Sequence, residues 1–274
     1  MRMHIMVNWT RSATLISRWL NALIFLALTG HFASAAETVD GAAVMQRVLA
    51  NRPALSLRLE AELRIERKTA ESYDLNIFLN GDPREVRTAY RVTGPAAAAG
   101  TAVLMIEGGD CWLCEKGKSE PRKITPAERA TPFLGGDFAY EDLELAFLRW
   151  PNHKFIRESR RLGFDCWVIE SAPGANTPSQ YGRVLSWVDK QYMAVVIAEA
   201  YDARNKLLKN LEVKSVRKLD EKHYIVGQIA LSNVQSKSRT VLRVLEDHKT
   251  KLAPDIFSPE TFCKATATPP KKER

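Results

Sequence analysis

Four cysteines are the side chains best suited to chemistry in this sequence, and Cys111 and Cys114 have the C-x-x-C spacing of a redox pair. The pair follows a glycine hairpin in a segment predicted to be a strand, with no βαβ unit around it. Residues three apart on a regular strand point to opposite faces, so we expect no disulfide between Cys111 and Cys114. Cys166 and Cys263 complete the set, and a structural disulfide somewhere among the four is favoured over redox catalysis.

The remaining reactive side chains form no recognisable active site. After the first 36 residues the histidines are His153, His223 and His248, and none has metal-ligand spacing to another histidine or to a cysteine. There is no G-x-S-x-G motif, and Gly117-Lys118-Ser119 resembles the end of a phosphate loop but has Trp112 where a glycine is required. We therefore expect a protein that is not an enzyme, with no catalytic residues, no metal and no cofactor.

The segment from Thr131 to Leu145 is rich in apolar side chains and lies between runs of predicted strands. Gly135 and Gly136 are expected to form a hinge, and Asp137 is expected to cap a helix that begins near Phe138. The large apolar side chains are those of Phe133, Leu134, Phe138, Tyr140, Leu143 and Leu145. Two interpretations stay open: an ordinary plug of the core of a β domain, or a movable lid over an apolar cavity.

Most of the chain consists of alternating segments typical of antiparallel strands. From Leu57 to Arg67 apolar and charged residues alternate, which predicts one buried and one solvated face. Further strands are expected at 73–79, 86–92, 101–107, 110–115, 153–161, 164–171, 181–189, 193–202, 206–217, 224–232 and 239–246. Helical spacing of Val44, Val48 and Leu49 predicts a helix within 39–51. The pattern is typical of a mainly β protein, either a barrel or a strongly curved antiparallel sheet.

The first 36 residues have the three parts of a secretory signal peptide. Arg2, Arg11 and Arg18 precede an apolar run over 19–28, and small residues follow at 33–36. Removing these three arginines lowers the formal net charge from +8 to +5. We expect the rest of the chain to be soluble and periplasmic, and so small a charge does not favour nucleic acid as a partner. Residues 264–274 are expected to be a disordered tail.

The segment Pro132-Phe-Leu-Gly-Gly-Asp-Phe-Ala-Tyr-Glu-Asp-Leu143 resembles the signature of the LolA-like outer-membrane lipoprotein-sorting protein family. Supporting similarity lies at 183–190, 201–209, 231–242 and 255–257, in the order of the family, and covers most of the expected domain, 37–263. The resemblance implies an unclosed antiparallel β-barrel, or half-barrel, with an N-terminal helix and a short helical lid over an apolar concave face. Cys111 and Cys114 depart from the family pattern.

The resemblance also implies a function. Family members are periplasmic carriers, so we expect a chaperone that shields the acyl chains of a lipoprotein or lipid between an inner-membrane exporter and an outer-membrane acceptor. The alternative is an envelope-stress sensor or scaffold that binds a protein partner with the same fold. The side chains expected to line the cavity and its lid are those of Leu59, Leu63, Leu75, Tyr90, Trp112, Phe133, Leu134, Phe138, Tyr140 and Leu143, with Gly135 and Gly136 as the lid hinge.

Overall fold

A computed structural model describes residues 39–52, 54–82 and 84–264. The expected signal peptide, residues 1–36, lies outside the described residues, as does all of the expected tail except Lys264. Within the described ranges, no helix is both long enough and apolar enough to cross a membrane.

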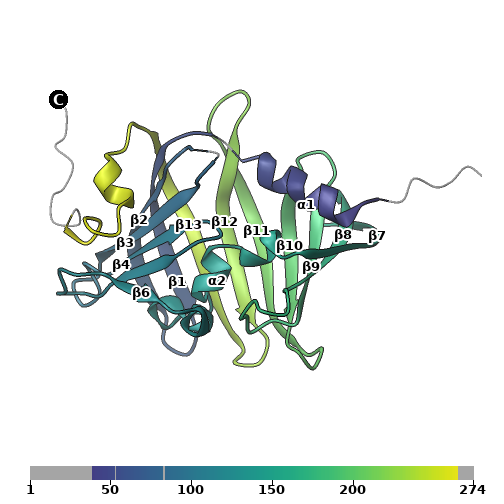
Figure 1. Ribbon diagram of the computed structural model, residues 1–274, viewed down its shortest axis with the longest axis horizontal. Coiled ribbons are helices and arrows are strands. Elements are labelled where there is room, and N and C mark those ends of the chain that lie inside the picture. The colour runs from purple at the N-terminus through teal and green to yellow at the C-terminus, as the bar shows by residue number, and fades with distance from the viewer. Residues whose placement is uncertain (1–38, 53, 83, 265–274) are drawn as a thin grey trace, which may run out of the picture. The chain divides into compact units, whose positions relative to one another are not determined.

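Thirteen antiparallel strands form one sheet with the order β6-β5-β4-β3-β2-β1-β13-β12-β11-β10-β9-β8-β7 (Figure 1). The strands are β1 (Leu57–Glu66), β2 (Glu71–Leu79), β3 (Arg87–Gly94), β4 (Ala102–Ile106), β5 (Cys111–Cys114), β6 (Arg122–Ile124), β7 (Asn152–Arg161), β8 (Phe164–Ala172), β9 (Arg183–Asp189), β10 (Ala194–Tyr201), β11 (Leu207–Lys218), β12 (Tyr224–Asn233) and β13 (Ser238–Lys249). The end strands β6 and β7 do not pair with each other, so the sheet is an unclosed barrel and the expected fold class is confirmed.

Twelve of these strands coincide with the expected segments to within a few residues. The thirteenth, β6, has only three residues, which is too short for an alternation to be recognised. In the middle of the sheet β1 pairs with β13, and Glu62 lies opposite Arg243, 181 residues further along the chain.

One face of the sheet, called the inner face here, carries the main core. Alternate residues of β1 point to it, including Leu59, Ala61 and Leu63, while their charged neighbours point away. Helix α1 (Gly41–Ala50) begins after Asp40, whose carboxylate accepts a hydrogen bond from the N–H of Ala42 over 2.9 Å. It buries Val44, Met45 and Val48 in the same core, and Figure 1 shows it on the same side of the sheet as α2 (Tyr140–Leu143).

Simple alternation predicts that the outer face is solvated throughout, but part of it is buried. Residues 254–264 begin with the 3-10 helix η4 (Pro254–Phe257) and contribute Phe257, Phe262 and Cys263 to a second core over β2 to β5. The Cys114–Cys263 disulfide joins this segment to β5. Strand β4 is therefore buried on both faces. The disulfide confirms a structural pairing among the four cysteines, and Cys111 and Cys114 are not bonded to each other, as expected.

Candidate functional site

Residues 131–150 form a separate cover over the inner face, called the lid here. It contains the 3-10 helix η2 (Phe133–Gly135), helix α2 and the 3-10 helix η3 (Ala146–Arg149). Its backbone hydrogen bonds join lid residues to each other, for example Phe133 N–H to Phe138 O over 2.7 Å and Leu148 N–H to Leu145 O over 3.0 Å. Within the described ranges no backbone–backbone hydrogen bond links the lid to a strand of the sheet. The lid is therefore held to the sheet by side chains.

The apolar side chains of the lid fill the inner face. Phe133, Phe138 and Tyr140 are buried, and the ring of Phe133 lies 6.3 Å from that of Tyr90 and 6.2 Å from that of Tyr140, centroid to centroid. The expected cavity residues that join them in the main core are Leu59, Leu63, Leu75 and Tyr90. Leu134 and Leu143 are partly buried against it.

Trp112 does not lie with the other expected cavity residues. It packs against the second core, under the C-terminal segment, and Lys123 Nζ lies 5.9 Å from the centroid of its ring. The reason is the alternation of β5: Cys111 and Leu113 take the inner face, so Trp112 takes the outer one.

The backbone at both ends of α2 has unusual conformations. Gly135 has φ of 70°, and two leucines, Leu134 and Leu145, also lie in the left-handed region with φ of 51° and 50°. At Gly136, by contrast, a Cβ would be in tight contact, 3.1 Å from Thr240 Oγ1 and 3.3 Å from the side chain of Ile65. The second glycine of the expected hinge thus lies against the β1–β13 pair.

Asp137 does not cap a helix, and this expectation is wrong. Helix α2 begins at Tyr140, and its first turn is capped by Asp142, which accepts from the N–H of Ala139 over 2.8 Å. Asp137 instead accepts hydrogen bonds from the hydroxyls of Thr240, over 2.7 Å, and of Ser238. Its carboxylate therefore ties the lid to β13.

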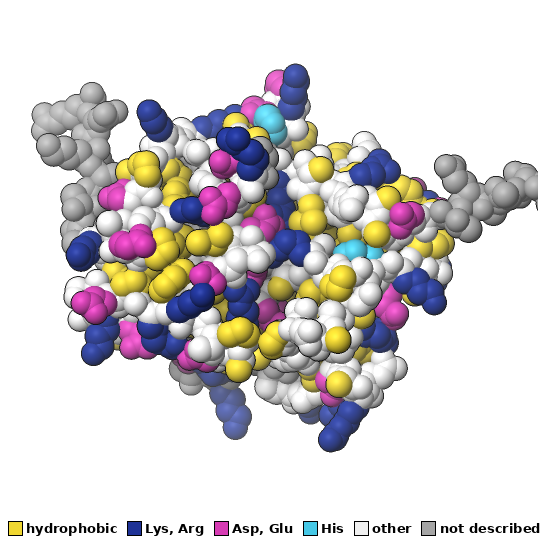
Figure 2. All heavy atoms as spheres, viewed as in Figure 1, with side chains coloured by type: hydrophobic (Ala, Val, Ile, Leu, Met, Phe, Trp, Pro, Cys, Tyr) yellow, Lys and Arg dark blue, Asp and Glu magenta, His cyan; other side chains and the backbone are white. Residues whose placement is uncertain are grey.

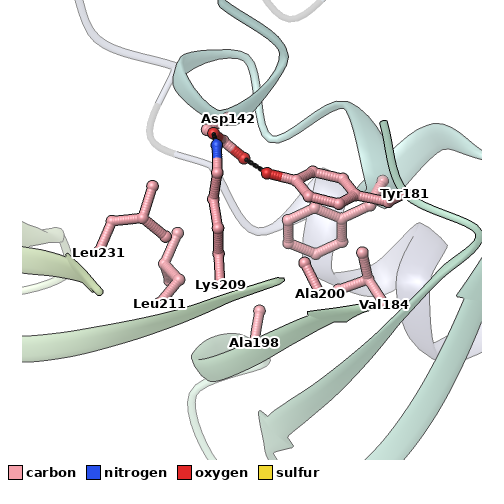
Figure 3. Close-up of a pocket in the computed structure, with 9 residues that line it drawn as sticks. Asp142, Tyr181, Val184, Ala198, Ala200, Lys209, Leu211 and Leu231 are labelled. Atoms are coloured by element: carbon pink, nitrogen blue, oxygen red, sulfur yellow. Dashed lines mark hydrogen bonds and ion pairs between the residues drawn. The ribbon is translucent and has the colours of Figure 1, made fainter. Parts of the chain in front are cut away.

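Asp142 ties the same lid to the other half of the sheet. Its carboxylate lies 2.7 Å from Lys209 Nζ on β11 and accepts a hydrogen bond of 2.7 Å from the hydroxyl of Tyr181 (Figure 3). The side chains of Asp142 and Lys209 are only 9% and 7% exposed. Burial and the neighbouring carboxylate raise the pKa of Tyr181, so its phenol keeps its proton and donates.

Two more carboxylates complete the attachment. Glu141 is buried and accepts from Ser179 Oγ over 2.6 Å and from Gln180 Nε2 over 2.8 Å, and burial raises its pKa. Glu144 pairs with Arg129 at 2.5 Å and with Arg149 at 2.8 Å. Four acidic side chains of the lid are thus engaged, and those of Asp137 and Asp142 reach strands of the sheet.

Sequence reasoning missed Lys209 and Tyr181 as site residues. The strand alternation could have identified Lys209. It precedes Leu211 by two positions, so its side chain lies on the face of β11 that points to the core. Tyr181 lies in the connection before β9, where no periodicity marks an inward side chain.

The space left beneath the closed lid is small. A cavity of about 10 Å³, enough for one water molecule, is lined by Asp142, Phe147, Tyr181, Val184, Ala198, Ala200, Lys209, Leu211 and Leu231 (Figure 3). An acyl chain cannot enter unless the lid moves, since the lid side chains already occupy the inner face.

Residues 115–129 form a charged segment before the lid, and several of its basic side chains pair with nearby carboxylates. Arg122 pairs with Glu115 and Glu128, and Lys123 pairs with Asp110 at 2.7 Å. Figure 2 shows acidic and basic side chains interspersed on the face viewed.

On the outer face Glu60, Glu246 and His248 place one potential metal-ligand atom each within 4.8 Å of one another. Glu60 is already engaged by Arg58 at 2.6 Å, so this group is an ion-pair cluster of β1 and β13.

A family model with the description "uncharacterized protein" matches residues 84–264, about two thirds of the chain. The chain belongs to this family. The match includes the whole lid and every strand from β3 to β13. No curated protein sequence is significantly similar to the chain.

Members of the same structural class confirm the resemblance to LolA-like proteins at the level of the fold. A putative outer membrane lipoprotein-sorting protein domain from Vibrio parahaemolyticus is 21% identical, with a TM-score of 0.75 over 81% of this chain and 98% of its own. A DUF1329 family protein from Desulfovibrio piger is 21% identical, with a TM-score of 0.73 over 80% and 95%. A LolA superfamily protein from Nitrosomonas europaea is 23% identical, with a TM-score of 0.63 over 80% and 98%.

Proposed function

We propose that this family member is a periplasmic carrier that shields acyl chains of a lipid or lipoprotein beneath the lid. The observation that carries the proposal is the attachment of the lid. Within the described ranges, no backbone–backbone hydrogen bond joins this apolar cover of the inner face to a strand of the sheet. The carboxylates of Asp137, Glu141, Asp142 and Glu144 hold it in place. A cover of this kind can leave without breaking the sheet.

The mechanism is exchange of one apolar surface for another. When the lid swings away, Phe133 and Phe138 leave the inner face and an acyl chain takes their place. Each methylene removed from water contributes about 0.8 kcal/mol, so the chain itself supplies the driving force that keeps the lid displaced. The function needs no bond to be made or broken, and the carrier is not an enzyme.

The printed name of the Vibrio parahaemolyticus structure refers to lipoprotein sorting, and this supports the choice of acyl chains as cargo. An exported location agrees with the charged and apolar parts of residues 1–36 and with the Cys114–Cys263 disulfide, a bond that persists in oxidising compartments. An inner-membrane exporter and an outer-membrane acceptor are the partners we propose.

A reversible lock tests whether the lid is the gate. A Cβ at position 136 would lie 3.1 Å from Thr240 Oγ1, which suits a disulfide in the double variant Gly136→Cys with Thr240→Cys. We expect the oxidised variant to bind a fluorescent fatty acid at least about tenfold more weakly than its reduced form, since a locked lid leaves no room for the chain.

Reductant can also break the native Cys114–Cys263 disulfide. Fatty-acid binding by both single variants and by wild type is therefore measured with and without reductant as a control. Equal binding by the oxidised and reduced double variant would show that the lid does not gate the inner face. A protein that binds a specific protein partner and no lipid would favour the sensor or scaffold instead.

A further inference from the structure

We propose that Lys209 is the recognition site for the anionic head of an amphiphilic ligand, and that Asp142 occupies this position while the lid is closed. The inference rests on the proposed carrier function and adds the chemical class of the cargo. Lys209 belongs to the sheet and Asp142 belongs to the lid, so the two partners of this ion pair separate when the lid moves.

The sheet residues around Lys209 are apolar, and the surface that they form under the lid is called the trough here. The neighbouring strands contribute Val184 from β9, Ala198 and Ala200 from β10 and Leu231 from β12 (Figure 3). The two alanines leave the floor of the trough low beside the lysine.

Lys209 is the cation of the main core. Among the residues that the structure describes, the buried cationic side chains are Lys209 and Arg91, and the guanidinium of Arg91 lies 5.0 Å from the ring centroid of Phe78 in the second core. No other buried cation of these ranges faces the cavity under the lid. An anion buried on the inner face beneath the lid can therefore pair with Lys209.

When the lid opens, the carboxylate of Asp142 leaves, but its two donors, Lys209 Nζ and Tyr181 OH, remain. Lys209 stays on β11, and the ring centroid of Tyr181 lies 5.6 Å from its Nζ, with the hydroxyl free to donate to a new acceptor. An acyl chain that fills the trough also excludes water from the ammonium. A buried charge without a partner is unfavourable, so the ligand that fits has its own anion at this end.

A group that replaces Asp142 must accept from both Lys209 Nζ and Tyr181 OH, each now 2.7 Å from a carboxylate oxygen. A fatty-acid carboxylate and a phosphate monoester meet this requirement. Acyl chains that end in an ester or amide carry no charge there. The site therefore selects an acidic lipid over the neutral acyl chains of a lipid-modified protein.

The test compares ligands that share one chain and differ in the head. Binding of oleate, 1-oleoyl lysophosphatidic acid and oleyl alcohol is measured by displacement of a fluorescent probe from the full chain. The proteins are wild type, Asp142→Asn, and Asp142→Asn combined with Lys209→Met. Asp142→Asn removes the competing charge with little change of size, and the double variant has the same lid residue without the cation.

We expect Asp142→Asn to bind oleate about tenfold more tightly than oleyl alcohol, because a charge-assisted hydrogen bond is then made with the ligand. We expect the double variant to bind the two equally. Preference for the lysophosphatidic acid over oleate would identify a phosphate head, and the reverse a carboxylate. The variant Glu120→Gln, the same change of acid to amide at an exposed position outside the lid, is the matched control, and its ratio of affinities should equal that of wild type.

Equal affinity of Asp142→Asn for oleate and oleyl alcohol would overturn the role of Lys209 and leave the carrier function standing. Absence of binding of all three ligands by folded wild-type and variant proteins would overturn both. Thermal unfolding of every variant establishes that the compared proteins are folded.

Discussion

Asp137 in the lid and Thr240 in β13 exchange two hydrogen bonds. The N–H of Asp137 donates to Thr240 Oγ1 over 2.9 Å, and the same hydroxyl donates to Asp137 Oδ2 over 2.7 Å. Both residues are buried, so no water replaces a lost partner at low cost.

The substitution Thr240→Val keeps the shape of the side chain and removes both bonds. We expect it to lower the free energy of unfolding by about 1–3 kcal/mol, because a buried carboxylate oxygen and an N–H lose their partner. Urea denaturation provides the measurement. Thr69→Val, at an exposed position, is the control and should change stability little. Equal effects of the two substitutions would contradict the importance of this link.

The pair formed by Asp142 and Lys209 predicts strong non-additivity. Lys209→Met alone leaves Asp142 buried without its cation, and we expect a loss of about 3–5 kcal/mol. Replacing both, as Asp142→Leu with Lys209→Met, should cost much less than the sum of the single changes, since no charge remains unpaired. A double-mutant cycle by chemical denaturation measures the coupling, and additive effects would argue against the buried pair.

The substitution Phe138→Asp separates a lid from an ordinary core plug. Phe138 is 3% exposed, so a carboxylate there would face hydrocarbon and should release the lid and abolish binding of a fluorescent fatty acid. Because no backbone–backbone hydrogen bond joins the lid to a strand in the part of the chain that the structure describes, the β-sheet circular dichroism and a cooperative unfolding transition should remain. Leu63→Asp, on β1, is the comparison and should unfold the domain. Unfolding of both variants would identify the segment as a core plug.

The stability of the lid depends on the protonation of Glu141. Burial raises the pKa of this carboxyl above its ordinary 4.5, so it binds a proton more tightly in the folded than in the unfolded chain. Stability conferred through this group therefore falls as the pH rises from 4.5 through the raised pKa. We expect wild type to gain stability relative to Glu141→Gln when the pH is lowered from about 8 to about 5. A pH-independent difference between their melting temperatures would contradict this.

All four cysteines should be protected from alkylation while the protein is folded. Burial raises the pKa of Cys111 to about 12 and that of Cys166 to about 11, so few thiolates are present near neutral pH. We expect iodoacetamide to modify both only after unfolding, and a non-reducing peptide map to contain Cys114 joined to Cys263. A peptide with Cys111 joined to Cys114 would contradict the structure.

The sequence predicts most strands because their burial is local and periodic. Leu57 to Glu66 has the expected alternation, and of the expected hinge glycines Gly135 has a positive φ and Gly136 lies in tight contact with β1 and β13. The errors come from contacts made over long separations. Asp137 has the preferences of a helix cap, but its partner Thr240 lies 103 residues away, and this stronger pairing determines its role. Trp112 is placed on the outer face by strand alternation, beneath a C-terminal segment that carries no strand pattern.

The sequence indicates the apolar residues of the candidate site but not its polar contacts. Apolar lid residues are recognisable from composition, whereas an ion pair between Asp142 and Lys209 depends on the fold that brings α2 over β11. The partners of Glu141 and Glu144 likewise lie on other segments, and no short-range motif encodes them.

The pairing of β1 with β13 means that the surface beneath the lid is formed by strands far apart in the sequence. Lid residue Gly136 lies against Ile65 of β1 and Thr240 of β13, so its resting place consists of two strands from opposite ends of the domain. A chain that is synthesised or translocated from its N-terminus has β1 and the lid long before β13 is delivered. Such non-local pairing is slow to form. The resting place of Gly136 is therefore complete only once residues 238–249 are present.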